Sequence, residues 1–237
     1  MIFKKRFNKL GINIINFIIQ EKLNDMSYLF NKCSSIKSVN FYNVETIQVN
    51  RMAAMFQLCK ELEYLDLTEF NTSNVNDLNY IFYECNELKT IKGINKFNTA
   101  NVTNMYGMFS GCMELENLDL SNFNASNVID MAHLFSCRKK LKQIKGINNL
   151  NTNYATTMKS MFQECNELQN LDLSKFNTRQ VKEMGWMFYG CNKLTEIKGL
   201  DKFNTINVTN MKSMFNKCYL LEQLDISGFN TSNVTDM

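Results

Sequence analysis

The sequence predicts an α/β solenoid, in which strand-turn-helix units of 26 or 27 residues stack and form a parallel sheet on one face. Three observations lead to this fold class: a phenylalanine recurs at a near-constant interval, the apolar period changes within each interval, and two unit types alternate. The chain has 237 residues, of which 45% are hydrophobic. It therefore has enough apolar material for one continuous core through all units.

The recurring phenylalanine defines the units. Successive copies are separated by 26, 26, 27, 26, 27, 26 and 27 residues. From the second copy onward, the 26-residue units contain Leu-Asp-Leu or a close variant, as at 65–67, and the 27-residue units contain Ile-Lys-Gly, as at 91–93. We expect a bulge at the glycine to absorb the extra residue without changing the direction of the side chains. The copies are Phe30, Phe56, Phe82, Phe109, Phe135, Phe162, Phe188 and Phe215.

Each unit contains two apolar periods. From Val75 to Leu88 the apolar residues recur every three or four positions, which predicts an amphipathic helix or a run of helical turns. Leu62, Leu65 and Leu67 are spaced as in a short strand. One unit is too small to bury its own apolar face, so about eight units must stack over residues 24–237.

The Leu-x-x-Leu-x-Leu-x-x-Phe-Asn pattern resembles a leucine-rich repeat, and the segments 118–131 and 224–237 resemble the BspA-like leucine-rich-repeat surface proteins. The resemblance implies a leucine-rich-repeat solenoid shaped as a curved horseshoe. It also implies a cell-surface or extracellular location and a non-enzymatic role in binding or adhesion. A cytoplasmic location is the alternative, because the sequence carries no convincing export signal and no lipid-anchor motif.

Charges alternate along the predicted sheet. The position ten residues after each phenylalanine holds Asp in one unit and Lys in the next, so in-register stacking should give each interior charge two opposite neighbours. Exposed pairs contribute only about 0–1 kcal/mol each, so the alternation should mainly define which unit lies beside which. The series is Asp66, Lys92, Asp119, Lys145, Asp172, Lys198 and Asp225.

The inner strand face is the candidate partner-binding surface. It should present the residues eight and ten positions after the phenylalanine, which are polar and balanced in charge. Such a surface suits a protein or glycan partner contacted over many units better than a small molecule in a deep pocket. An intracellular protein–protein interaction scaffold is the alternative function. The candidate residues are Tyr64, Asp66, Thr90, Lys92, Asn117, Asp119, Gln143, Lys145, Asn170, Asp172, Glu196 and Lys198.

The sequence gives little support for a metal site, a catalytic site, a cofactor site or nucleic-acid binding. The single histidine, His133, and the lack of any Cys-x-x-Cys pair argue against a metal site, and no catalytic constellation, phosphate loop or cofactor motif is present. A net charge of +3 is too small to indicate nucleic-acid binding. The eight cysteines occur one per unit and are expected to be free, buried thiols, because the outer arc of a horseshoe would hold them too far apart for disulfides. A set of asparagines is expected to be buried at the strand-to-turn corner and to bond turn backbone. They are Asn71, Asn98, Asn124, Asn151, Asn177, Asn204 and Asn230.

The two ends of the chain depart from the pattern. Residues 1–23 are expected to form an amphipathic helix that caps the first unit, with a signal peptide as the alternative. The array stops in mid-repeat at Met237, which predicts a fragment of a longer protein or end-to-end self-association. No segment is apolar enough over sufficient length to span a membrane.

Overall fold

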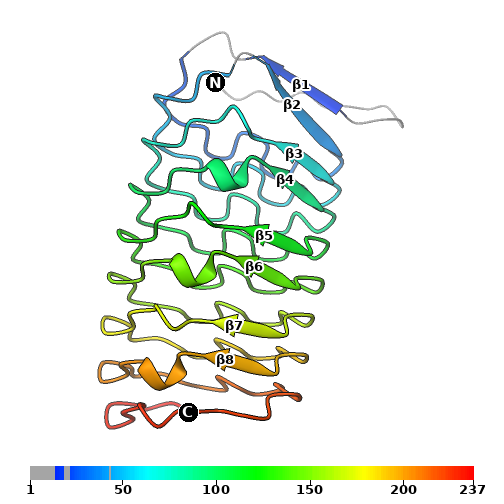
Figure 1. The fold of residues 1–237 in the computed structure, drawn as a ribbon. Coiled ribbons are helices and arrows are strands. Elements are labelled where there is room, and N and C mark those ends of the chain that lie inside the picture. The colour runs from blue at the N-terminus through cyan, green and yellow to red at the C-terminus, as the bar shows by residue number, and fades with distance from the viewer. Residues whose placement is uncertain (1–13, 19–21, 43) are drawn as a thin grey trace.

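The computed structural model describes residues 14–18, 22–42 and 44–237, which stack as successive rungs along one axis (Figure 1). One strand of each rung lies on the same side of the stack, and all strand pairs are parallel. We call this side the strand face. Its strands are β1 (Ile14–Ile18), β2 (Ser38–Tyr42), β3 (Tyr64–Asp66), β4 (Thr90–Lys92), β5 (Asn117–Asp119), β6 (Gln143–Lys145), β7 (Asn170–Asp172) and β8 (Glu196–Lys198).

The strands do not form one continuous sheet. β1 to β4 form one sheet, whereas β5 pairs only with β6 and β7 only with β8. In each of the pairs β3–β4, β5–β6 and β7–β8, a Leu-Asp-Leu rung precedes an Ile-Lys-Gly rung, and we call such a pair of rungs a couplet. Figure 1 shows wider spaces between β4 and β5 and between β6 and β7 than within the couplets.

A glycine in each Ile-Lys-Gly rung packs closely against the backbone of the preceding rung. Gly93, Gly146 and Gly199 have φ between 81° and 89° and begin three short 3₁₀ helices, η1 (Ile94–Lys96), η2 (Ile147–Asn149) and η3 (Leu200–Lys202). A Cβ on Gly146 would lie 2.7 Å from the backbone of Ser121 in the preceding rung. The predicted bulge is not seen: a short 3₁₀ helix after this left-handed glycine accommodates the extra residue. Only glycine permits such a close approach.

The segments predicted to be α-helical are runs of turns, so the strand-turn-helix description is wrong in its last element. No α-helix occurs in the described residues, and 79–84 is one example of the turns that replace it. In every rung the residues two before and two after the recurring phenylalanine have positive φ, as Tyr80 and Glu84 do around Phe82. Two left-handed residues four positions apart interrupt an α-helix. Apolar residues that recur every three or four positions are compatible with such turns as well as with a helix.

Hydrogen bonds link these turns from rung to rung. Between Leu78 and Glu84, alternate N–H groups donate to carbonyls of the next rung, as from Phe82 to Met108 at 3.1 Å. A parallel bridge also joins every pair of consecutive rungs from Asp25 to Asp236. We call the side of the stack that these turns form the turn face. A helical layer would hold neighbouring rungs further apart than strands do, and its absence explains why the rungs form a nearly straight column (Figure 1) and not the expected horseshoe.

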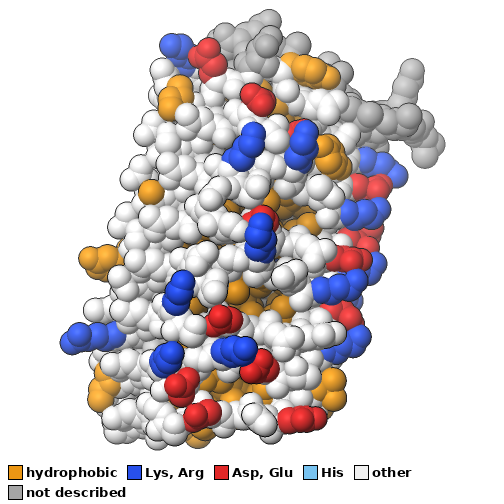
Figure 2. All heavy atoms as spheres, in the orientation of Figure 1, with side chains coloured by type: hydrophobic (Ala, Val, Ile, Leu, Met, Phe, Trp, Pro, Cys, Tyr) orange, Lys and Arg blue, Asp and Glu red, His pale blue; other side chains and the backbone are white. Residues whose placement is uncertain are grey.

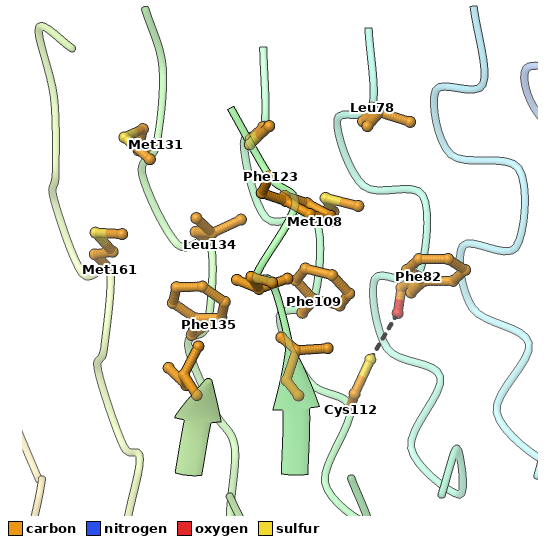
Figure 3. Packing of buried hydrophobic residues seen from close by; sticks show 14 of the residues in the cluster. Leu78, Phe82, Met108, Phe109, Cys112, Phe123, Met131, Leu134, Phe135 and Met161 are labelled. Atoms are coloured by element: carbon orange, nitrogen blue, oxygen red, sulfur yellow. Dashed lines mark hydrogen bonds between the residues drawn. The ribbon is translucent and has the colours of Figure 1, made fainter. Parts of the chain in front are cut away.

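The core is a column of stacked phenylalanines. From Phe30 to Phe215, consecutive ring centroids are 5.4–6.0 Å apart and the rings are nearly parallel. This column crosses the boundaries between couplets without interruption, as Phe82, Phe109 and Phe135 show (Figure 3). The phenylalanines therefore join the couplets where the strands do not.

All eight cysteines are free thiols, as predicted, but the predicted reason is wrong. Six of them donate from Sγ to the phenylalanine carbonyl of the preceding rung, as Cys112 does to Phe82 at 3.1 Å (Figure 3). Hydrogen bonds join consecutive rungs at these turns, so the wide outer arc that the prediction assumed is not present. Burial raises the pKa of the Cys165 thiol to about 12, which favours the protonated donor.

Buried threonines connect the rungs at the strand-to-turn corner. The neighbouring asparagines are exposed, contrary to the prediction, but they do bond turn backbone as predicted, as Asn71 Oδ1 accepts from the Ser73 N–H at 3.0 Å. Thr152 is fully buried, and its hydroxyl donates to the carbonyl of Asn177 at 2.9 Å while it accepts from the N–H of Asn177 at 2.8 Å. Thr46, Thr72, Thr99 and Thr205 make the same pair of bonds, whereas Ala125 occupies this position in its rung.

Thr152→Val should lower the free energy of unfolding by about 1–3 kcal/mol, because it leaves both backbone groups of Asn177 without their partner at nearly constant volume. Ala125→Thr should act in the opposite direction, with a gain of about 1 kcal/mol, because it adds the missing hydroxyl. Urea denaturation of both variants measures the two effects. A Thr152→Val protein as stable as the parent would contradict the structural role of the hydroxyl.

The first 23 residues are only partly described. Residues 14–18 form β1, which pairs in parallel with β2, while 1–13 and 19–21 lie outside the described residues. The capping helix expected over 1–23 is therefore wrong at 14–18, where the chain forms a strand. Over 1–13 and 19–21 the helix, or the alternative signal peptide, lies outside the described residues. Within the part of the chain that the structure describes, no helix has the length and apolar character that a membrane crossing requires.

Candidate binding face and its grooves

The structure places all twelve candidate residues on the strand face. They occupy the first and third positions of β3 to β8, while the middle leucine or isoleucine points into the core. The three aspartates are half-buried and the other nine residues are exposed. This arrangement follows from the side-chain alternation of a strand, so the sequence pattern was sufficient to place them together.

Ion pairs on this face form within couplets. Lys92 Nζ lies 2.9 Å from Asp66 Oδ2, and Lys145 Nζ lies 2.9 Å from Asp119 Oδ2. Asp119 has no ion pair with Lys92 on the other side, so the expectation that each interior charge has two opposite neighbours is wrong. The wider space between β4 and β5 explains the difference. In the third couplet no ion pair joins Lys198 to Asp172, which accepts hydrogen bonds from Ser174.

Asp119 should contribute to the acid sensitivity of the fold. Hydrogen bonds from Ser121 and Lys145 lower the pKa of its carboxyl to about 2, below the value of about 3.9 in an unfolded chain. A lowered folded-state pKa stabilises the fold above about pH 4, and the contribution is lost as the pH falls toward 2. Because the carboxylate is largely solvated, we expect less than about 1 kcal/mol. Urea midpoints at pH 7 and pH 3 should differ less in Asp119→Asn than in the parent; an equal difference would contradict this assignment.

Two equivalent grooves separate the couplets on the strand face. The first groove, of about 820 Å³, lies between β4 and β5, and the second, of about 770 Å³, lies between β6 and β7. In the described residues, no strand pairing joins β4 to β5 or β6 to β7. Figure 2 shows hydrophobic atoms at depth between the charged rows of this face. The face is therefore a series of flat couplets with grooves between them.

A family model described as "Mycoplasma protein of unknown function, DUF285" matches residues 2–92, 24–146, 87–197 and 169–237. The chain belongs to this family. The overlapping matches follow from the internal repeat of this DUF285 protein. No curated protein sequence matches the chain.

Three solved structures resemble this DUF285 protein, and all three are described as leucine-rich proteins. A leucine-rich repeat protein of T. pallidum is 16% identical, with 89% of this chain and 79% of that chain covered and a TM-score of 0.43. A leucine-rich cell surface protein from Faecalibacterium prausnitzii is 15% identical, with 97% and 84% covered and a TM-score of 0.31. A leucine-rich repeat protein from Bacteroides ovatus is 16% identical, with 91% and 75% covered and a TM-score of 0.27.

The DUF285 chain offers little to a metal ion or a reacting group. Among its described residues, no cluster of three or more His, Cys, Asp or Glu side chains could hold a metal. Burial and the nearby Lys159 lower the pKa of His133, so this side chain is neutral near pH 7. His133 packs beside the ring of Tyr106 on the turn face, with 5.4 Å between centroids.

The sequence interpretation missed the residues that form the grooves. Gly93, Ile94, Asn95, Glu114 and Leu115 line the first groove beside the predicted face residues. The signal that could have located them is the extra residue of the Ile-Lys-Gly unit. The extra residue forms a 3₁₀ turn after the strand where a bulge was expected, and it marks the rung after which strand pairing ends.

Proposed function

We propose that the chain is a non-enzymatic binding module that engages a protein or glycan partner through its strand face. The observation that carries this proposal is the pair of equivalent grooves between rows of exposed polar residues. A partner that contacts several rungs can gain a small contribution from each one. A role in adhesion and a location on the cell surface complete the proposal, in keeping with the family resemblance.

The charge arrangement supports a partner that is neutral or mixed in charge. Within the first two couplets each lysine of the face lies beside an acid, so neither sign dominates locally. A polyanion or a polycation would meet as much repulsion as attraction on this surface. Hydrogen-bonding partners such as protein backbone, neutral side chains and sugar hydroxyls meet no such penalty.

Site-specific photocrosslinking tests the proposal. A benzophenone amino acid replaces Gln143 or Asn170 on the strand face, and in matched control proteins it replaces Lys159 or Lys212 on the turn face. The proteins are exposed to the surface fraction of candidate cells and, in parallel, to a printed glycan array. We expect crosslinks or glycan binding that depend on the strand-face positions. Crosslinks from the turn-face positions alone would contradict the proposal.

An intracellular scaffold that uses the same face is the second candidate function. The eight free thiols favour it, because exported proteins commonly bridge their cysteines. Immunolocalisation of the full-length natural protein separates the two functions. Surface labelling on intact cells supports the adhesion role, and labelling only after permeabilisation supports the scaffold.

A further inference from the structure

Strand edges border both grooves. β4 pairs with β3 on one side and β5 pairs with β6 on one side, but no backbone hydrogen bond joins β4 to β5. The same holds for β6 and β7. The edge of a strand presents backbone N–H and C=O groups that can pair with a further strand. Each groove therefore has such an edge on both sides.

The first groove is a short window with defined ends. At one end the Glu114 N–H donates to the Asn86 carbonyl at 3.2 Å, and at the other end Asn122 Nδ2 donates to the Asn95 carbonyl at 2.7 Å. Between these contacts lie the three-residue strands, which span about 10 Å. The second groove is bounded at the same end by a longer contact, 3.5 Å from Asn148 Nδ2 to Asp172 Oδ2. An extended segment could pair over about three residues in each window.

The charged side chains beside the first groove form ion pairs within their own couplets. On the β4 side Lys89 and Lys92 bind Glu63 and Asp66, and on the β5 side Asp119 binds Lys145. In the described residues no ion pair crosses the groove. An ionic ligand would have to compete with these existing pairs. A ligand with neutral donors and acceptors avoids that cost.

The floor of the first groove is apolar. Ile91, Ile94, Leu115 and Leu118 line it and are only 3–6% exposed, so they are covered but lie directly beneath the window. An extended peptide directs alternate side chains to opposite faces. A segment that enters the window would therefore place apolar side chains toward the floor and polar side chains between the lysine and aspartate rows.

We propose that each groove accepts an extended segment of a partner protein, which adds as a strand between two couplets. The segment has three to five residues that alternate between apolar side chains and neutral polar ones such as threonine, asparagine or glutamine. This inference rests on the proposed function, because it names the partner and the contact on the same face. Backbone pairing on both sides supplies most of the affinity, and the outward side chains supply the selectivity.

Peptides selected against the whole chain test this directly. A random heptapeptide library on phage is panned on the immobilised 237-residue protein, and the selected peptides are synthesised with normal backbones and with alternate backbone nitrogens methylated. N-methylation removes the backbone donor and retains the side chain. The protein variants are the double substitution Asn117→Trp with Asn170→Trp, which fills both grooves, and Tyr28→Trp. The last is a control on the turn face, at an exposed position where another rung has Trp186.

We expect one of the two methylation registers to raise the Kd at least tenfold, and the Asn117→Trp/Asn170→Trp protein to lose binding to the same extent. Tyr28→Trp should bind as the parent does. Hydrogen exchange in 89–95 and 114–119 should slow when the unmethylated peptide binds the parent protein. This readout and the methylated peptides decide the question even if the double variant fails to fold.

Three results would overturn the inference: no peptide is selected, both methylated forms bind as tightly as the parent peptide, or exchange slows only outside the grooves. Binding of glycans and not peptides on a printed array would likewise replace it. These failures leave the proposed function intact if Asp119→Lys and Lys145→Glu still weaken partner binding. Crosslinks confined to the turn face would instead remove the proposed function itself.

Discussion

Arg138→Cys should stabilise the protein by about 1–4 kcal/mol, as replacement of other buried charged groups by neutral side chains has done. Arg138 is fully buried at the position where the other seven rungs have cysteine. Its guanidinium donates to the carbonyls of Phe109 at 3.1 Å and Leu115 at 3.5 Å, while its Nε has no partner. No carboxylate among the described residues pairs with it. The buried charge is therefore compensated only by backbone dipoles and the Phe109 ring, 5.8 Å away.

The cysteine should take over one of these bonds. Its Sγ can donate to the Phe109 carbonyl, as Cys112 does to Phe82 and Cys165 to Phe135. Loss of the charge removes the desolvation cost, which lowers the pKa of Arg138 in the folded protein. The volume also decreases, so Arg138→Met provides a neutral side chain of closer length. Both variants should unfold at higher urea concentration than the parent.

Arg179→Cys is the matched control for this substitution. Arg179 is exposed, so the same change there should alter stability by no more than about 0.5 kcal/mol. Urea denaturation monitored by far-ultraviolet circular dichroism compares the three variants with the parent. Lower stability of both Arg138→Cys and Arg138→Met would show that the two guanidinium hydrogen bonds outweigh the cost of burying the charge.

Gly146→Ala should destabilise the second couplet by about 2–5 kcal/mol, the sum of steric overlap and left-handed backbone strain. The added Cβ would lie 2.7 Å from Cα and N of Ser121 and 2.9 Å from the carbonyl carbon of Leu120. These atoms are backbone and cannot rotate away. To relieve the overlap, β6 must move away from β5. This movement weakens the Lys145–Asp119 ion pair and the hydrogen bond from the Leu120 N–H to the Lys145 carbonyl.

Gly107→Ala is the control with the same substitution and a similarly left-handed backbone. Gly107 has φ 57°, and its nearest contact is the Tyr80 ring at 3.0 Å, a side chain that can shift. Another rung has Ala54 at this position with φ 54°, so the change should cost less than about 1 kcal/mol. Because repeat proteins open locally, hydrogen exchange in 117–119 and 143–145 should increase only in Gly146→Ala. Equal losses in both variants would mean that backbone strain, and not the close approach, sets the cost.

Several features of the fold could be predicted from the spacing of residues along the chain. The interval between phenylalanines predicts the stacking, and the stacking brings Asp119 beside Lys145 on adjacent strands. The same regularity identifies the twelve face residues, because a strand directs every second side chain outward. These predictions hold because they need only the repeat length and the strand period.

The turns were predicted incorrectly because side-chain spacing does not report the sign of φ. Apolar intervals of three and four fit an amphipathic helix, yet the backbone turns left-handed two residues before and two residues after each phenylalanine. A signal was present in the sequence, since Gly107, Gly111 and Gly190 occupy these positions. Most rungs place other residues there, such as Tyr80 and Trp186, and thereby conceal it.

The repeat length and the strand period, both present in the order of residues, were sufficient for the solenoid, its alternating rungs and the composition of its exposed face. The grooves, the straight column and the lack of ion pairs across the grooves depended on how neighbouring rungs contact one another. A left-handed glycine packs one rung closely against the rung before it, while hydrogen bonds on the turn face keep all rungs linked. The strand face is open between β4 and β5 and between β6 and β7, and only the packed structure shows where.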